Sequence, residues 1–71
     1  MTATVPSLDE VIAQQVEQHT GRRVRNLSVE VIGDEVVLRG RANSFHVKQL
    51  AQQGVRAVLP FAPLRNAIVV D

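Results

Sequence analysis

A chain of 71 residues forms one domain at most, and without cysteine it must fold around a small core that no disulfide supports. Its net charge of +1 excludes a strong overall electrostatic attraction to nucleic acid or to membranes. Two phenylalanines are the only aromatic residues, too few for the base-stacking surfaces of most single-stranded nucleic-acid binders. Nucleic acid is therefore not expected as a partner.

Residues 1–6 are expected to form a flexible lead, and residues 7–71 a single domain. The lead has neither the basic start nor the apolar run of a secretory signal, so a cytoplasmic location is expected. Ser7 and Glu10 fit a capping box, in which each side chain accepts a hydrogen bond from the other residue's backbone N–H. A mostly apolar stripe at helical spacing follows: Leu8, Val11, Ile12, Gln15, Val16 and His19. This stripe predicts a helix over 8–20 that ends at Gly21, in the left-handed conformation.

The segment from Val24 to Gly40 has the pattern of a β-hairpin. Apolar and polar residues alternate along its first half, the period of a strand with one buried face. Gly33 and Asp34 then supply a tight turn, because glycine tolerates the positive φ that such turns need. The inward-facing residues are expected to be Leu27, Val29, Val31, Val36 and Leu38.

A second helix and a third strand complete the chain. Asn43 and Ser44 are candidate caps for a helix whose apolar stripe is Val47, Leu50, Ala51, Gly54, Val55 and Val58. Gly54 in the middle of that stripe suggests a close approach to the sheet or to the other helix. Two prolines, at 60 and 63, predict a connection, and 64–70 then reads as a strand with Leu64, Ile68 and Val70 inward.

This order of elements predicts an α+β fold, an αββαβ two-layer sandwich. Its three-stranded mixed sheet would carry both helices on one face, because both helices need an apolar surface to cover. A right-handed crossover through the second helix would place the third strand parallel to the second, either beside it or one strand away.

Three segments resemble the BON domain, a bacterial module named from osmotically inducible and nodulation-linked proteins. They are V-E-V-I-G-D-E-V-V-L-R-G at 29–40, K-Q-L-A-Q-Q at 48–53 and L-R-N-A-I-V-V at 64–70. The resemblance covers nearly the whole chain from Ser7 onward. It implies a non-enzymatic module with proposed roles in phospholipid association and as an accessory domain of channels, secretins and osmotic-stress proteins. The family's usual V-x-G-V before the last strand is replaced here by L-P-F-A-P-L at 59–64.

The residues themselves also favour a non-enzymatic protein that has no cofactor. Metal and catalytic sites need several converging His, Cys or carboxylate groups, and the two histidines, His19 and His46, stand alone in the sequence. No nucleophile–base pair or phosphate-binding loop is recognisable. His19 is expected to interact with the carboxyl end of the first helix, and His46 to face solvent.

Arginines define two candidate surfaces. Arg22, Arg23 and Arg25 follow the first helix and can form an anion site for phospholipid headgroups, although ordinary solvated arginines are the simpler interpretation. The sheet face away from the helices is the candidate interface, where exposed aliphatic residues would be framed by arginines. Its expected members are Val37, Arg39, Arg41, Arg65, Ala67 and Val69.

Phe61, on the proline-stiffened connection, has two interpretations. Phenylalanine is usually buried, which favours a role for Leu59 and Phe61 in closing the bottom of the core. The alternative is an exposed apolar tip that enters a partner or a membrane interface.

We therefore expect an interaction module of BON type that self-associates, as a homo-oligomer, or attaches to a larger protein assembly. The alternative from a different class is a module that binds anionic phospholipid at a membrane surface. The sheet-face interpretation also predicts that Val37→Asp would weaken association and leave the monomer folded.

Overall fold

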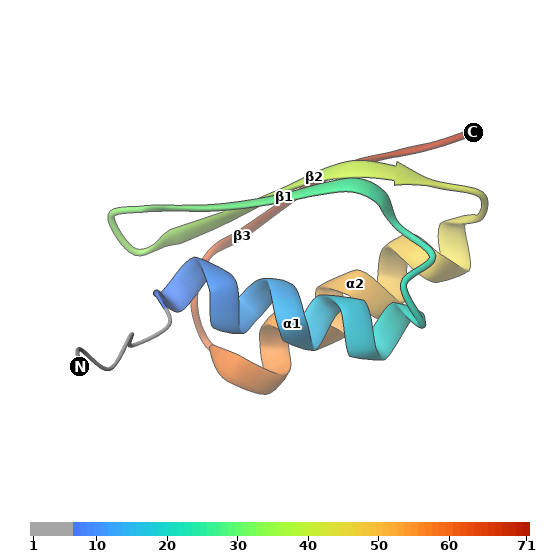
Figure 1. The fold of residues 1–71 in the computed structure, drawn as a ribbon. Coiled ribbons are helices and arrows are strands. Elements are labelled where there is room, and N and C mark those ends of the chain that lie inside the picture. The colour runs from blue at the N-terminus through green and yellow to red at the C-terminus, as the bar shows by residue number, and fades with distance from the viewer. Residues whose placement is uncertain (1–6) are drawn as a thin grey trace, which may run out of the picture.

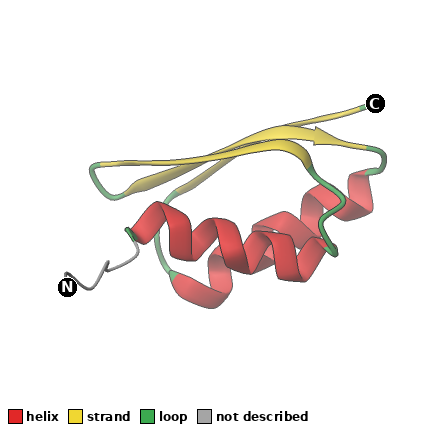
Figure 2. Ribbon diagram, in the orientation of Figure 1, coloured by secondary structure: helices red, strands yellow, loops and turns green. Residues whose placement is uncertain are grey.

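The computed structural model describes residues 7–71, and the expected lead at 1–6 lies outside the described residues. Its elements are α1 (Leu8–Thr20), β1 (Arg25–Ile32), β2 (Glu35–Ala42), α2 (Phe45–Val58) and β3 (Leu64–Val70). The strands form one sheet in the order β1-β2-β3, with β1 antiparallel and β3 parallel to β2. Figure 1 and Figure 2 show the sheet as one layer and both helices as the other. The predicted α+β sandwich is confirmed, and β3 lies directly beside β2.

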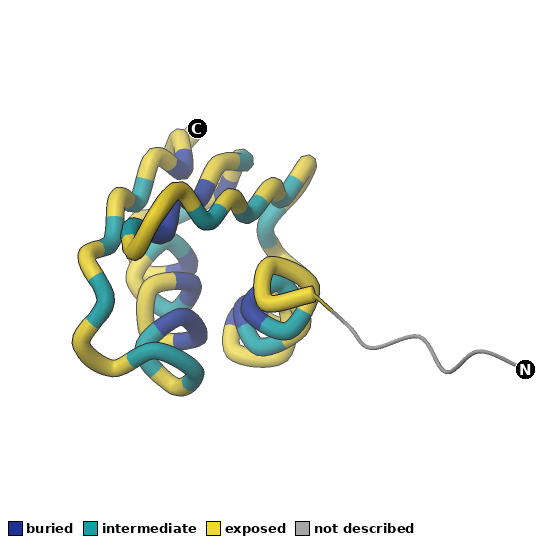
Figure 3. The backbone as a smooth tube through the Cα atoms, turned by 90° about the vertical axis from the view of Figure 1, so that its left-hand side faces the viewer, coloured by how far each residue is buried: buried dark blue, intermediate teal, exposed yellow. Residues whose placement is uncertain are grey.

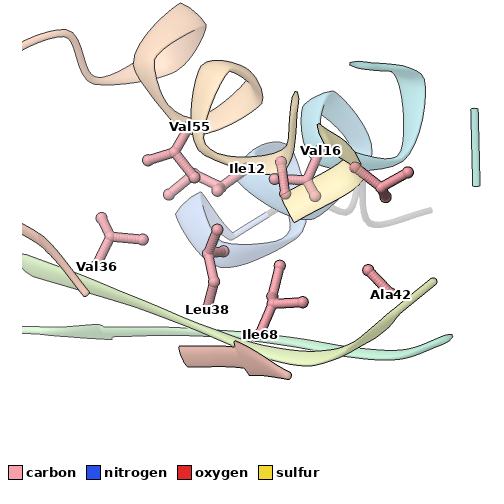
Figure 4. Packing of buried hydrophobic residues seen from close by; sticks show 9 residues of the cluster. Ile12, Val16, Val36, Leu38, Ala42, Val55 and Ile68 are labelled. Carbon is pink, nitrogen blue, oxygen red and sulfur yellow. The ribbon is translucent and has the colours of Figure 1, made fainter. Parts of the chain in front are cut away.

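The core lies between the two layers (Figure 3). Figure 4 shows Ile12, Val16 and Val55 of the helices directed toward Leu38 and Ile68 of the sheet. All five side chains are almost completely buried. At roughly 1.5–3 kcal/mol for each large aliphatic side chain removed from water, their burial is a major stabilising contribution for a domain of this size. The inward residues predicted for the hairpin all belong to this core or pack against it.

Both ends of α1 differ in detail from the pattern of its sequence. The helix ends at Gly21 in the left-handed conformation, as predicted, but the expected capping box is wrong because the Ser7 side chain caps no helical N–H. The Ser7 side chain, together with the backbone N–H groups of Asp9 and Glu10, instead favours the ionised Asp9 carboxylate and lowers the pKa of that group. At the other end Thr20 is buried, and its hydroxyl group is satisfied there because it donates to the Val16 carbonyl oxygen at 2.8 Å. His19, expected to continue the apolar stripe, is exposed.

The two helices approach each other closely at Gly54. A Cβ atom placed on Gly54 would lie 2.8 Å from the Val16 Cα and 2.9 Å from the Gln15 carbonyl oxygen. Both atoms belong to the backbone of α1, so they cannot move aside as the end of a flexible side chain can. The helix-to-helix alternative for Gly54 is therefore the one that the structure supports.

The cap of α2 is also as expected, since Ser44 Oγ accepts from the Val47 N–H at 3.3 Å.

The hairpin contains a bulge that the alternating sequence pattern does not reveal. The pairing of β1 with β2 shifts between Arg25 and Ser28, and Asn26 within that interval has a φ of 54°. Opposite the bulge, a Cβ atom on Gly40 would lie 2.9 Å from the Arg25 carbonyl oxygen. A glycine in β2 therefore gives the bulged strand room to approach.

An asparagine occupies the free edge of β3. The backbone groups of Pro63 and Asp71 bond to β2. Backbone groups of successive residues in a strand point to opposite edges, so the N–H of Ile68, an even-numbered position, points to the edge of β3 that has no neighbouring strand. Asn66 Oδ1 accepts from that N–H at 3.3 Å, and Asn66 Nδ2 donates to the Lys48 carbonyl oxygen of α2 at 2.9 Å. The side chain thus connects the edge strand to the helix and occupies a donor that another strand could otherwise bind.

We predict that Gly54→Ala destabilises the protein by about 1–3 kcal/mol, the usual cost of overpacking. Alanine favours a helix by roughly 1 kcal/mol over glycine, so a loss of stability would show that the contact with α1 dominates. Urea unfolding followed by circular dichroism measures the change. Gln53→Ala, at an exposed neighbouring position, is the control and should change stability by no more than about 0.5 kcal/mol. A more stable Gly54→Ala variant would contradict the close approach.

Candidate interaction site

The loop between α2 and β3 is held in place by Arg56. The Arg56 guanidinium, on the last turn of α2, donates to the carbonyl oxygens of Pro60, at 3.3 Å, and of Ala62. Pro63 fixes the far end of the loop, because its carbonyl oxygen accepts from the Val36 N–H at 2.9 Å. Two prolines and these hydrogen bonds restrict the loop to few conformations.

Phe61, at the tip of this loop, is 96% exposed. The favoured expectation that it closes the core is therefore wrong, whereas the same expectation for Leu59 is confirmed, since Leu59 packs against the core. The carbonyl groups on both sides of Phe61 are engaged by Arg56, which leaves its side chain on the outside of the loop. Sequence hydropathy could not separate these two residues, because the difference depends on a hydrogen bond from a neighbouring helix.

The Phe61 loop belongs to an end of the molecule that is rich in carboxylates. The start of α1, the β1–β2 turn and the α2–β3 loop all lie at this end, on the left of Figure 1. Two exposed aliphatic side chains, Leu8 and Ile32, belong to the same end. Its acidic residues are Asp9, Glu10, Asp34 and Glu35. We call this region, with Phe61 at its loop, the acidic end.

The predicted sheet-face interface is partly wrong, because Val37 is only 3% exposed. Val37 lies between the core residues Val36 and Leu38, so it points away from the helices, as expected. On that outer face its pairing neighbours are Glu30 and Arg65, on either side of the central strand. Long side chains beside a central valine cover it with their aliphatic stems, which explains its burial outside the core.

The remaining predicted residues of this face are exposed, and some of them are paired. Arg39 donates to Glu30, and the Asp71 carboxylate accepts from Arg25 and lies 3.7 Å from Arg41 Nη1. These pairs are solvent-exposed and contribute roughly 0–1 kcal/mol each. On β3, the exposed members of this face are Arg65, Ala67 and Val69, and Arg65 makes no ion pair within residues 7–71. The exposed aliphatic residues of this face thus form a narrow strip along β3, Ala67 and Val69, with Ile32 apart from it at the end of β1.

Each of the three arginines proposed for anion binding has a different partner within the chain. Arg22 Nε lies 3.8 Å from a Glu17 carboxylate oxygen, and Arg23 Nε donates to the Thr20 carbonyl oxygen at 2.7 Å. Arg25 reaches across the sheet to the carboxylate of Asp71. A phosphate would have to compete with these partners, so the anion site remains a prediction.

A shallow groove of about 560 Å³ lies along the outer side of α2, next to β3. Phe45, the first residue of α2, forms one part of its wall and is 62% exposed. The rest of the lining consists of glutamines, Asn66 and the two basic side chains of Lys48 and Arg56. The lining includes no carboxylate, so an acidic partner surface would suit it better than a basic one. This groove had no signal in the sequence, because its residues are polar and look like an ordinary solvated helix face.

Both histidines are exposed, as expected for His46, and the His19 ring contacts a backbone carbonyl group of its own helix. His19 Nδ1 lies 2.8 Å from the Gln15 carbonyl oxygen, one turn earlier in α1. Within residues 7–71, no group of three or more His, Cys, Asp or Glu side chains is arranged to hold a metal ion. Neither α1 nor α2 is long and apolar enough to cross a membrane.

Comparisons with protein-family models, with curated proteins and with solved structures found no match to this chain.

We predict that Val37→Asp destabilises the monomer by at least about 2 kcal/mol. The change removes a buried valine, worth roughly 1.5–3 kcal/mol, and buries a carboxylate between Glu30 and Arg65. Urea unfolding provides the measurement. Val69→Asp is the matched control, since Val69 is on the same face but 55% exposed, and it should cost no more than about 0.5 kcal/mol. Equal stability of the two variants would mean that Val37 is not covered.

Proposed function

We propose that this protein is a non-enzymatic interaction module of BON type, which acts by self-association or by attachment to a larger assembly. The observation that carries the proposal is a phenylalanine almost fully exposed on a loop that its own chain holds rigid. A free phenylalanine in water brings no stability to the monomer, so a binding role accounts for its position.

A rigid aromatic anchor is well suited to binding. Aromatic side chains supply much of the binding energy at many interfaces, where a few residues dominate. Ordering a loop on binding costs free energy, and a loop already fixed by Arg56 and two prolines avoids much of that cost. Phe61 can therefore enter a partner's pocket without rearrangement of the fold.

Charge favours a protein partner over the anionic phospholipid alternative. The acidic end, which presents Phe61, carries Asp9, Glu10, Asp34 and Glu35 against Arg56 and Arg65, so its net charge is negative and anionic headgroups would be repelled. The arginines proposed for lipid binding follow the opposite end of α1. Flotation with anionic vesicles at low salt tests the alternative, and salt-sensitive binding that requires Arg22, Arg23 and Arg25 would favour it.

We predict that Phe61→Ser weakens the principal interaction of the protein about 30-fold or more, as expected for an anchor worth at least 2 kcal/mol. Affinity capture from cells with quantitative mass spectrometry, together with sedimentation of the purified protein, measures attachment and self-association. The fold should be unaffected, because Phe61 contributes nothing to the core; circular dichroism checks this. If Phe61→Ser retains every interaction of the wild type, or the wild type has none, the proposal fails.

Arg56→Gln tests whether the rigid loop matters as well as the ring. This variant keeps Phe61 but removes the guanidinium that holds the Pro60 and Ala62 carbonyl groups. We predict an intermediate loss of affinity, about three- to tenfold, from the ordering cost restored to the loop. Affinity as high as that of the wild type would show that Arg56 does not preorganise the anchor.

A further inference from the structure

The two aromatic residues of the chain lie at opposite ends of the same helix, and both are exposed. Phe45 is the first residue of α2, and Phe61 lies in the loop that follows the last turn of α2. Their side chains are 62% and 96% exposed. In Figure 1 the start of α2 and the α2–β3 loop are at opposite ends of the molecule. Each end of the molecule therefore presents one phenylalanine.

The charges of the chain are separated along the same axis. The acidic end contains four carboxylates, against Arg56 and Arg65. The opposite end, which we call the basic end, contains the α1–β1 connection, the start of α2 and the end of β3 (Figure 1). Its cationic residues are Arg22, Arg23, Arg25, Arg41 and Lys48, and its acidic residues are Glu17 and Asp71. The net charge of +1 hides this polarity, because the two ends nearly cancel.

Phe45 is accompanied by a surface that complements the acidic end. The groove along α2 begins at Phe45 and includes Lys48, and its lining has no carboxylate. An aromatic ring entering beside Phe45 can make an edge-to-face or offset contact, which adds to the gain from burying its apolar area. The carboxylates of the acidic end, which lie at the start of α1 and at the hairpin turn, would face the cationic residues of the basic end, including Lys48.

We propose that the protein associates head to tail with further copies of itself. Phe61 at the acidic end of one copy packs against Phe45 and the part of the groove beside it, next to Lys48, at the basic end of the next. This inference rests on the proposed function, which it specifies by naming the partner and both contacting surfaces. Contact between two acidic ends, or between two basic ends, would bring like charges together. Each contact should therefore join the acidic end of one copy to the basic end of another.

Such a contact is heterologous and leaves both outer surfaces of a dimer free. Each added copy presents a new acidic end or a new basic end, so assembly continues as a chain or closes into a ring. The Asn66 side chain at the β3 edge is compatible with this mode, because it discourages growth by strand pairing at that edge.

Two complementary variants test the direction of the contact. Phe61→Ser removes the anchor from the acidic end and leaves the basic end intact, whereas Phe45→Ser does the reverse. Sedimentation equilibrium of the wild type should show a mass that increases with concentration beyond that of a dimer. Each variant alone should associate at least tenfold more weakly. An equimolar mixture should form a one-to-one dimer, because the Phe45→Ser copy has an intact acidic end and the Phe61→Ser copy has an intact basic end. Assembly should stop there, since that contact uses both intact ends.

Two controls separate this contact from other modes. Val69→Ser alters the exposed strip of the sheet and should assemble like the wild type. Salt near 1 M, where the screening length falls to about 3 Å, should weaken assembly of the wild type at least several-fold. If Phe45→Ser still assembles like the wild type, or the mixture stays monomeric, the head-to-tail contact is wrong.

The outcomes also distinguish this inference from the proposed function. If the wild type remains monomeric at a protein concentration of about 1 mM, its dissociation constant is weaker than that value, and head-to-tail assembly is overturned. If Phe61-dependent attachment to another protein persists in that case, the proposed function stands. If Phe61→Ser changes neither assembly nor attachment, both proposals fail.

Discussion

The contact between α1 and α2 at Gly54 is the constraint on which the other features of this fold depend. The backbones approach so closely there that a single Cβ atom would overlap Val16. Two helices at this separation can share one face of a three-stranded sheet, so Ile12 and Val55 belong to one core with Leu38 and Ile68 (Figure 4). A wider separation would open a void in a core too small to lose contacts. The glycine in α2 is thus a requirement of packing, although it lowers the helix propensity of its own segment.

The same arrangement determines which residues lie at each end of the molecule. Because α2 extends from one end of the molecule toward the other, its first residue and the loop after it are held far apart, and each carries one phenylalanine (Figure 1). The start of α1 and the hairpin turn add carboxylates at one end, while the connection after α1 adds arginines at the other. Topology therefore converts a sequence with almost no net charge into an elongated molecule with two different ends.

The sequence predicted the fold well because the fold follows from the spacing of apolar residues along each element and from the residue types at the turns. The stripes of the two helices, the hairpin turn and the inward residues of β1 all depend on local spacing. The outer surface was harder to predict. Val37 has the period of an exposed residue, yet it is covered because it occupies a central strand between the long side chains of Glu30 and Arg65. Phe61 has the hydropathy of a core residue, yet a guanidinium from α2 fixes its loop with the ring outside. In both cases the outcome depends on neighbours distant in sequence or in the next element, which periodicity does not include.

The most direct test of this account is a dilution series followed by amide chemical shifts in two-dimensional NMR. Head-to-tail contact predicts concentration-dependent shifts in two separate regions, the loop around Phe61 and the first turn of α2 around Phe45. The exposed strip at Ala67 and Val69 should change little. Shifts confined to that strip, or to the Phe61 region alone, would contradict the account, because they would place the contact on the sheet face or make it symmetric.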